Sequence, residues 1–154
     1  KRTLLQDIND NTARSNLMWT SAMAENGILN VGRLTDFECH QIEHQLGAYT
    51  DCNHGQGLAV IHPVYYRHIV KDASEKFARM GQAVFGVEGA EAAVEALTVF
   101  IKECGLPTKL SQLHSRTEIT PELLRQVADS TNLLPNGYKQ LPHDEVYEIL
   151  MERL

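Results

Sequence analysis

The chain has 154 residues, of which 43% are hydrophobic and 22% are charged, and these proportions are typical of a globular protein rather than a disordered one. The 14 basic residues against 20 acidic ones give a net charge of −6, and no block of lysines or arginines is present. We therefore expect neither nucleic acid nor a membrane as a partner, because nucleic acid and anionic lipids both bind basic surfaces.

The same composition bears on where the protein works. The apolar runs are only a few residues long, so the sequence predicts no membrane-spanning segment, and the first residues lack the apolar core of a signal peptide. The 3 cysteines form no CxxC pair, which favours a reducing cytoplasm over a disulfide framework. Because the chain starts with Lys1 inside an apparent helical pattern, we also expect it to be a piece of a longer protein.

No stretch of the chain alternates apolar and polar residues over the length of a strand. The sequence therefore predicts one all-α domain without a sheet, in which about six to seven helices follow the tail of a first one. The tail is expected at residues 1–8, and the helices at residues 10–25, 35–47, 54–69, 72–86, 88–104, 120–130 and 144–153.

Local signals mark where several of these helices begin and end. Thr35 with Glu38 fits a capping box, in which the hydroxyl and the carboxylate each accept from the other's amide. Gly47 is expected to stop that helix, leaving residues 48–53 as a link. Thr120 followed by a proline is a strong start signal for a later helix.

Four of the 7 histidines lie close together in the second quarter of the chain. His40 and His44 lie four residues apart, hence on one face of the predicted helix, while His54 begins the next helix and His62 follows on it. A single histidine on a helix is usually a surface or core residue, but neutral imidazole is also the commonest side-chain ligand of divalent transition metals. Asp36, His40 and His44 follow one another at intervals of four residues. From spacing alone, the candidate ligands are therefore Asp36 and all four histidines.

Two imidazoles alone make a poor metal site, because a catalytic zinc usually takes three protein ligands and a structural zinc four. The spacing therefore predicts either a further ligand elsewhere or an incomplete site. Cys39 and Cys104 are expected to be small buried apolar groups rather than ligands.

Two runs of sequence carry a resemblance to a known family. They read DFECHQIEHQLGA at residues 36–48 and HGQGLAVIHP at residues 54–63, with supporting matches in NLMW at 16–19, GLPT at 105–108 and DEVYEIL at 144–150. The chain resembles the iron-containing (group III) alcohol dehydrogenases, and most of all their butanol dehydrogenase-like branch. The resemblance covers nearly the whole chain but only the C-terminal, all-helical, metal-binding part of the family's two-domain architecture.

The resemblance implies roles for particular residues. His40 and His54 match the family's two histidine metal ligands, whereas His44 matches a histidine that does not ligate but lies near the metal and the nicotinamide and handles a proton. Asp36 matches no ligand position, and His62 matches a position that is generally not a ligand. The family's other two ligands, an Asp and a His, and its nucleotide-binding domain belong to residues upstream of Lys1.

The activity implied by the resemblance is hydride transfer between NADP(H) or NAD(H) and a primary alcohol or aldehyde, whose oxygen is polarised by Fe²⁺ or Zn²⁺. The implied partners are this small substrate, the missing N-terminal domain and, since this branch usually dimerises, a second copy of the protein. An isolated piece of this kind is expected to be inactive.

The alternative is a helical structural-metal or interaction module without redox activity, in which His40, His44 and His54, with Cys52, close a zinc site. A helical domain that holds no ion is the third interpretation.

Overall fold

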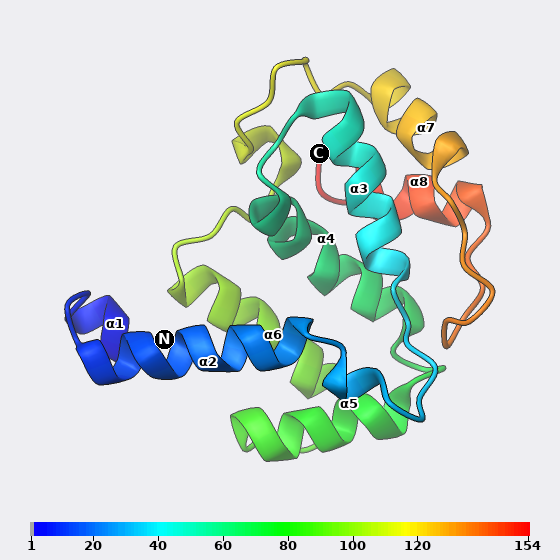
Figure 1. The fold of residues 1–154 in the computed structure, drawn as a ribbon. Helices are drawn as coiled ribbons and strands as arrows, with labels where there is room; N and C mark the ends of the chain where they lie inside the picture. Colours follow the sequence, from blue (N-terminus) through cyan, green and yellow to red (C-terminus); the bar gives the residue numbers. More distant parts are fainter. Residues whose placement is uncertain (1) are drawn as a thin grey trace. The chain divides into compact units, whose positions relative to one another are not determined.

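The computed structural model describes residues 2–154, and within this range every regular element is helical. The α-helices are Arg2–Gln6 (α1), Asn11–Glu25 (α2), Glu38–Thr50 (α3), His54–Ile69 (α4), Ser74–Met80 (α5), Ala90–Glu103 (α6), Pro121–Ser130 (α7) and His143–Met151 (α8). Short 3₁₀ turns occur at Ile28–Asn30 (η1) and Leu110–Gln112 (η3), and a π-helical turn, Gly81–Phe85 (η2), continues α5. The predicted all-α fold is confirmed (Figure 1).

The described residues divide into two compact units, one ending at Thr35 and the other spanning Asp36–Leu154. The first unit holds α1, α2 and η1. No residue of α2 is buried, although Asp10 caps it by accepting a hydrogen bond from the Ala13 amide. The expectation that the whole chain is one domain stays a prediction.

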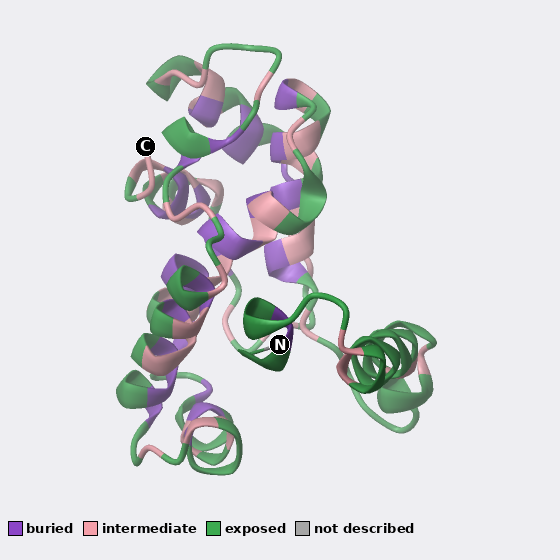
Figure 2. Ribbon diagram, turned by 90° about the vertical axis from the view of Figure 1, so that its left-hand side faces the viewer, coloured by how far each residue is buried: buried purple, intermediate pink, exposed green. Residues whose placement is uncertain are grey.

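The second unit is built around α3 and α4, which pack against each other (Figure 1). Helix α7 packs on α3 and α8, while α6 packs on α4 and α5. Buried residues, purple in Figure 2, lie on these helices and form one hydrophobic core. The core includes a fully buried set of large side chains: Ile42, Leu46, Ile61, Val64, Tyr65, Leu124, Val127, Ile149 and Leu150.

The α3–α4 pair differs from its prediction in two ways. Thr35 forms no capping box: Phe37 is the N-cap residue without a side-chain hydrogen bond, and Oε2 of Glu38 accepts from the distant Leu134 amide at 2.7 Å. Gly47 does not stop α3, which continues to Thr50 because Leu46 and Thr50 are both buried, and packing outweighs the weak helix propensity of one glycine. The link to α4 is therefore only residues 51–53.

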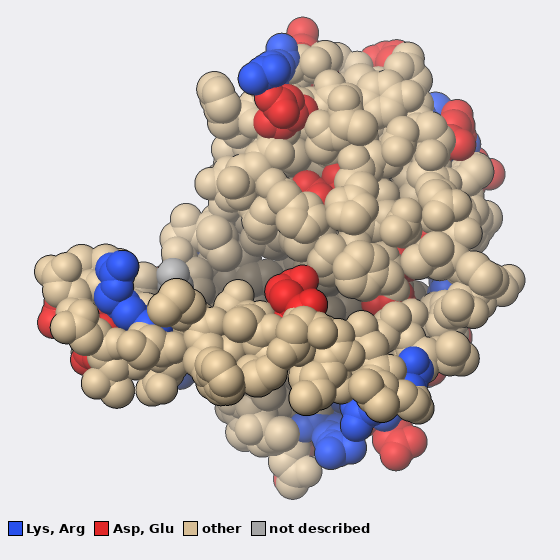
Figure 3. Space-filling view, viewed as in Figure 1, with Lys and Arg blue, Asp and Glu red and all other residues tan. Residues whose placement is uncertain are grey.

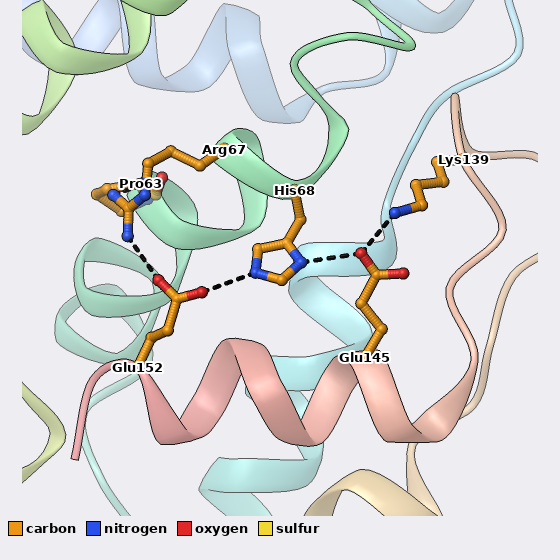
Figure 4. Close-up of polar contacts among 6 residues, drawn as sticks. All are labelled: Pro63, Arg67, His68, Lys139, Glu145 and Glu152. Atoms are coloured by element: carbon orange, nitrogen blue, oxygen red, sulfur yellow. Dashed lines mark hydrogen bonds and ion pairs between the residues drawn. The ribbon is translucent and has the colours of Figure 1, made fainter.

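A histidine also joins α4 to α8. His68 places Nδ1 2.8 Å from Glu145 Oε1 and Nε2 2.9 Å from Glu152 Oε1 (Figure 4). Lys139 Nζ contacts the same Glu145 oxygen at 2.5 Å, and Arg67 donates to Glu152 Oε2 at 3.0 Å. These contacts join the C-terminal end of α4 to α8 and to the residue that follows it. The other end of α4 begins at His54.

Candidate metal centre

Four histidine rings converge where α3 runs alongside α4. The ring centroids of His40 lie 6.0 Å from His44, 5.6 Å from His54 and 6.0 Å from His62. His44 and His54 are closer still, at 5.3 Å. The structure thus brings the four histidines of residues 40–62 together, with the ring of His40 beside the other three.

The local folding explains why two helices can aim these rings at one point. His40 and His44 are one turn apart on α3, and the three-residue link returns the chain so that His54 opens α4. Asp51 allows this sharp return by adopting a left-handed conformation with φ of 53°. Asn53 caps α4 by accepting a hydrogen bond from the Gln56 amide.

The histidines differ in their surroundings. His44 and His54 are exposed, whereas His40 is half-buried and stacks on Phe37 with a centroid separation of 4.0 Å. His62 is also half-buried, and its Nδ1–H donates to the Leu58 carbonyl at 3.1 Å. Burial lowers the pKa of His62 to about 4, so this ring is neutral at neutral pH.

Asp36 is engaged in other hydrogen bonds and is therefore a poor candidate for a metal ligand. Both of its carboxylate oxygens accept from the hydroxyl of buried Tyr65 at 2.8 Å, and Oδ1 also accepts from the Glu38 amide. Burial, followed by the hydrogen bond to Asp36, raises the pKa of Tyr65 well above its ordinary range, so the phenol keeps its proton and donates it. Asp36 therefore holds α3 to α4 instead of extending the row of histidines.

The cysteines divide between two environments. Cys39 is buried as expected, and burial raises the pKa of its thiol, which makes it unreactive. Cys104 is only half-buried, so its expected burial is wrong, because it caps the C-terminus of α6 beyond the last buried residue, Ile101. Cys52 is half-buried, and its Sγ lies 4.0 Å from Glu43 Oε1.

Sequence reasoning missed Glu43, which is central to the site. Its carboxylate contacts Nδ1 of His54, and the side chain is only 2% exposed. Burial raises the pKa of Glu43, and the contact with His54 offsets part of that rise. The signal was present in the sequence: Glu43 falls on the same helical stripe as the apolar residues Cys39, Ile42 and Leu46, where an acidic residue is unexpected.

Among the described residues, one set of three potential ligands has donor atoms within 4.8 Å of one another, namely Glu43, His44 and His54. This set shares only His54 with the pair implied by the family resemblance, His40 and His54. Both sets consist of nitrogen and oxygen donors, which suit divalent transition metals such as Fe²⁺ or Zn²⁺. The donor chemistry of the α3–α4 junction therefore fits such an ion.

Comparison with known proteins places the chain in a family. Residues 1–154 match the Fe-containing alcohol dehydrogenase family, C-terminal. The chain belongs to the iron-containing alcohol dehydrogenase family. It is 36% identical over 154 residues to the NADH-dependent butanol dehydrogenase B of Clostridium acetobutylicum, a match that covers 94% of this chain and 40% of that protein.

Other relatives agree. The NADH-dependent butanol dehydrogenase A of the same organism is 29% identical over 153 residues, which cover 94% of this chain and 39% of that protein. The crystal structure of NADH-dependent butanol dehydrogenase A from Thermotoga maritima superposes with a TM-score of 0.84 at 30% identity, over 99% of this chain and 42% of the other. The chain thus spans about two fifths of the length of these relatives. None of the described helices is long and apolar enough to cross a membrane.

Proposed function

We propose that this chain supplies the metal-binding part of the active site of an NAD(P)H-dependent alcohol dehydrogenase or aldehyde reductase. The observation that carries the proposal is the convergence of His40, His44 and His54 from α3 and α4, with ring centroids 5.3–6.0 Å apart, in a member of this family. Family membership favours this function over a structural zinc site or an ion-free helical module.

His40 and His54 are assigned as the metal ligands. They come from different helices, and their ring centroids lie 5.6 Å apart, which is close enough for the two rings to share one ion. The stacking of His40 on Phe37 and the contact of His54 with Glu43 restrict both rings. Restricted ligands lose less conformational freedom on binding, which favours affinity.

His44 is assigned to handle a proton. It is exposed, one turn beyond His40, and its ring lies 5.3 Å from that of His54, so one of its ring nitrogens can exchange a proton with substrate or solvent beside the metal. Histidine suits this role because its ordinary pKa is close to neutral pH. The metal, Fe²⁺ or Zn²⁺, supplies Lewis-acid polarisation of the substrate oxygen, and the nicotinamide supplies the hydride.

The rest of the active site is proposed to lie in residues outside this chain. The relatives it matches are more than twice as long, and the family resemblance places an Asp and a His ligand and the nucleotide-binding domain upstream. Relatives carry names with either nucleotide, since the butanol dehydrogenases are called NADH-dependent and YqhD of Escherichia coli is called an NADPH-dependent aldehyde reductase. We keep both nucleotides, a primary alcohol or aldehyde as substrate, a cytoplasmic location and a homodimer as parts of the proposal.

The first test reads the coding sequence upstream of Lys1. An Asp and a His four residues apart on a predicted helix, preceded by a nucleotide-binding domain with a glycine-rich loop after a strand, are the expected finding. If both features are missing there, the dehydrogenase proposal fails and the structural-metal alternative takes its place.

The second test uses the longer protein encoded there. His54→Ala is expected to lower metal content and turnover together, whereas His44→Ala is expected to lower turnover by roughly 10²–10⁴-fold while most of the metal remains. Metal analysis alongside assays of aldehyde reduction would separate the two roles. The opposite ordering, with metal lost from His44→Ala and retained in His54→Ala, would contradict the assignment. The 154-residue chain alone is expected to show no turnover.

A further inference from the structure

Glu43 is an acidic side chain in a position that the fold otherwise reserves for apolar groups. It projects from α3 toward α4, and only 2% of the side chain is exposed. A carboxylate buried this deeply is costly unless it is hydrogen-bonded or paired. The groups that contact the Glu43 carboxylate must therefore stabilise it.

The carboxylate is confined on several sides. Oε2 contacts Nδ1 of His54, and Oε1 lies 4.0 Å from Cys52 Sγ. A Cβ atom added at Gly57 would lie 2.6 Å from Oε1 and 2.9 Å from Cγ of Glu43, so only glycine leaves room for this side chain at α4. Gly47 faces it more loosely, since a Cβ there would lie 3.7 Å from Oε1. Glycine at position 57 of α4 therefore makes room for this carboxylate, whereas a Cβ at position 47 would make an ordinary contact with it.

We infer that Glu43 is a positioning residue for His54, an inference that rests on the proposed function. By accepting a hydrogen bond from Nδ1–H, Glu43 holds His54 in the tautomer that leaves Nε2 without a proton. Only an unprotonated ring nitrogen can bind a metal, so the contact prepares Nε2 as the ligand atom. Carboxylate–histidine pairs of this kind orient the ring and raise its basicity as a ligand.

The contact with Nδ1 also argues against Glu43 as a ligand in its own right, although its oxygen lies within 4.8 Å of donor atoms of His44 and His54. The Glu43 oxygen nearest to His54 is already engaged with Nδ1, and the Glu43 side chain is only 2% exposed, whereas the side chain of His54 is 52% exposed. Glu43 therefore acts through His54.

The direct test measures the tautomer of His54 in the metal-free 154-residue chain by ¹⁵N NMR of its ring nitrogens, at a pH where the ring is neutral. We expect the proton on Nδ1 in the wild type and in Glu43→Gln, whose amide oxygen still accepts. In Glu43→Leu, which removes the acceptor but fills the space, we expect the proton to move to Nε2. Circular dichroism of each variant confirms that α3 and α4 remain folded.

The second readout is the dissociation constant for Co²⁺ of the longer protein proposed to contain this chain, measured from the absorption spectrum of the bound ion. Glu43→Leu should weaken binding by about 10–100-fold, as losses of such carboxylate partners do, and Glu43→Gln should weaken it less. Gly57→Ala should also weaken binding, because the added methyl group displaces the carboxylate without removing it.

Glu38→Leu is the matched control, since Glu38 is also a buried carboxylate on α3, but its Oε2 accepts from the Leu134 amide instead of contacting His54. Its removal should leave Co²⁺ affinity unchanged. The inference is overturned if the His54 tautomer is the same in Glu43→Leu as in the wild type, even where affinity falls, because that result makes Glu43 a ligand or a packing group. If the wild type binds no Co²⁺ but the tautomer changes as expected, the metal-binding function fails and the positioning role stands.

Discussion

The ring of His68 lies between Glu145 of α8 and Glu152, the residue that directly follows α8 (Figure 4). Both ring nitrogens can donate to these carboxylates only when the imidazole is charged. Burial opposes ionisation of Glu145, but Lys139 and His68 outweigh it and lower its pKa; at Glu152 burial is likewise outweighed by His68 and Arg67. This cluster therefore ties α4 to α8 through charged hydrogen bonds.

Replacement of His68 by Gln is expected to lower the free energy of unfolding at neutral pH by about 1–3 kcal/mol, the usual loss for hydrogen bonds to charged groups. The folded-state pKa values of Glu145 and Glu152 are lowered, so both carboxylates stabilise the folded protein above the ordinary pKa of glutamate, about 4.3. This stabilisation is lost as the pH falls from that value through the lower folded-state pKa values. The stability of His68→Gln should consequently depend less on pH between neutrality and acid.

Urea unfolding at a series of pH values would measure both effects. His114→Gln is the control, since His114 is exposed. Equal losses of stability in the two variants would refute the role given to His68.

The residues of the candidate metal centre could be predicted from the sequence only in part. His40, His44 and His54 were identifiable because their spacing and residue type suggest metal chemistry, and the structure brings them together. Glu43 was missed because a glutamate beside a histidine on a helix reads as a solvated residue unless its position on the buried stripe is weighed. The fit of Gly57 around Glu43 depends on how α3 packs on α4, which no local pattern encodes.

Helix boundaries followed the sequence where the deciding interaction is local. Thr120 accepts from the Leu123 amide at 3.3 Å and Pro121 begins α7, as the start signal predicted. Thr35 carries a similar signal without effect, because Glu38 is held by the Leu134 amide, 96 positions away along the chain. Contacts between distant segments decide such cases, and a single sequence does not reveal them.

These two threonines give a paired test at the scale of helices. Thr120→Ala should destabilise the protein by about 1 kcal/mol through loss of the N-cap hydrogen bond, and Thr120→Ser should restore most of that loss. Thr35→Ala should change the free energy of unfolding by no more than about 0.5 kcal/mol, the usual range for exposed positions without such a contact. Thermal and urea unfolding would measure all three variants, and a loss in Thr35→Ala equal to that in Thr120→Ala would show that the capping box forms after all.

At the scale of the molecule, the residues up to Thr35 expose many large apolar side chains, namely Leu5, Ile8, Leu17, Met18, Trp19, Ile28, Leu29, Val31 and Leu34. Uncharged side chains also dominate the surface of α2 in the space-filling view (Figure 3). Exposed apolar surface of this extent is typical of regions that bind another protein surface.

The isolated chain is accordingly expected to bind the dye ANS and to self-associate with rising concentration. Met18→Lys should reduce dye binding and self-association, because Met18 is 72% exposed within this apolar group. Val84→Lys is the control, since Val84 is similarly exposed, at 67%, but belongs to η2 in the other unit. Dye fluorescence and light scattering would measure the effect, and equal values for both variants would argue against an apolar surface localised before Thr35.

The central claim of the proposed function is that His40 and His54 bind the metal and that the neighbouring histidines do not. The decisive measurement is the Co²⁺ dissociation constant of the longer protein proposed to contain this chain, compared among His40→Ala, His44→Ala, His54→Ala and His62→Ala. We predict that His40→Ala and His54→Ala lose metal binding, while His44→Ala and His62→Ala retain it close to the wild-type value. Loss of binding in His44→Ala together with retention in His40→Ala would instead identify Glu43, His44 and His54 as the ligands and would contradict this assignment.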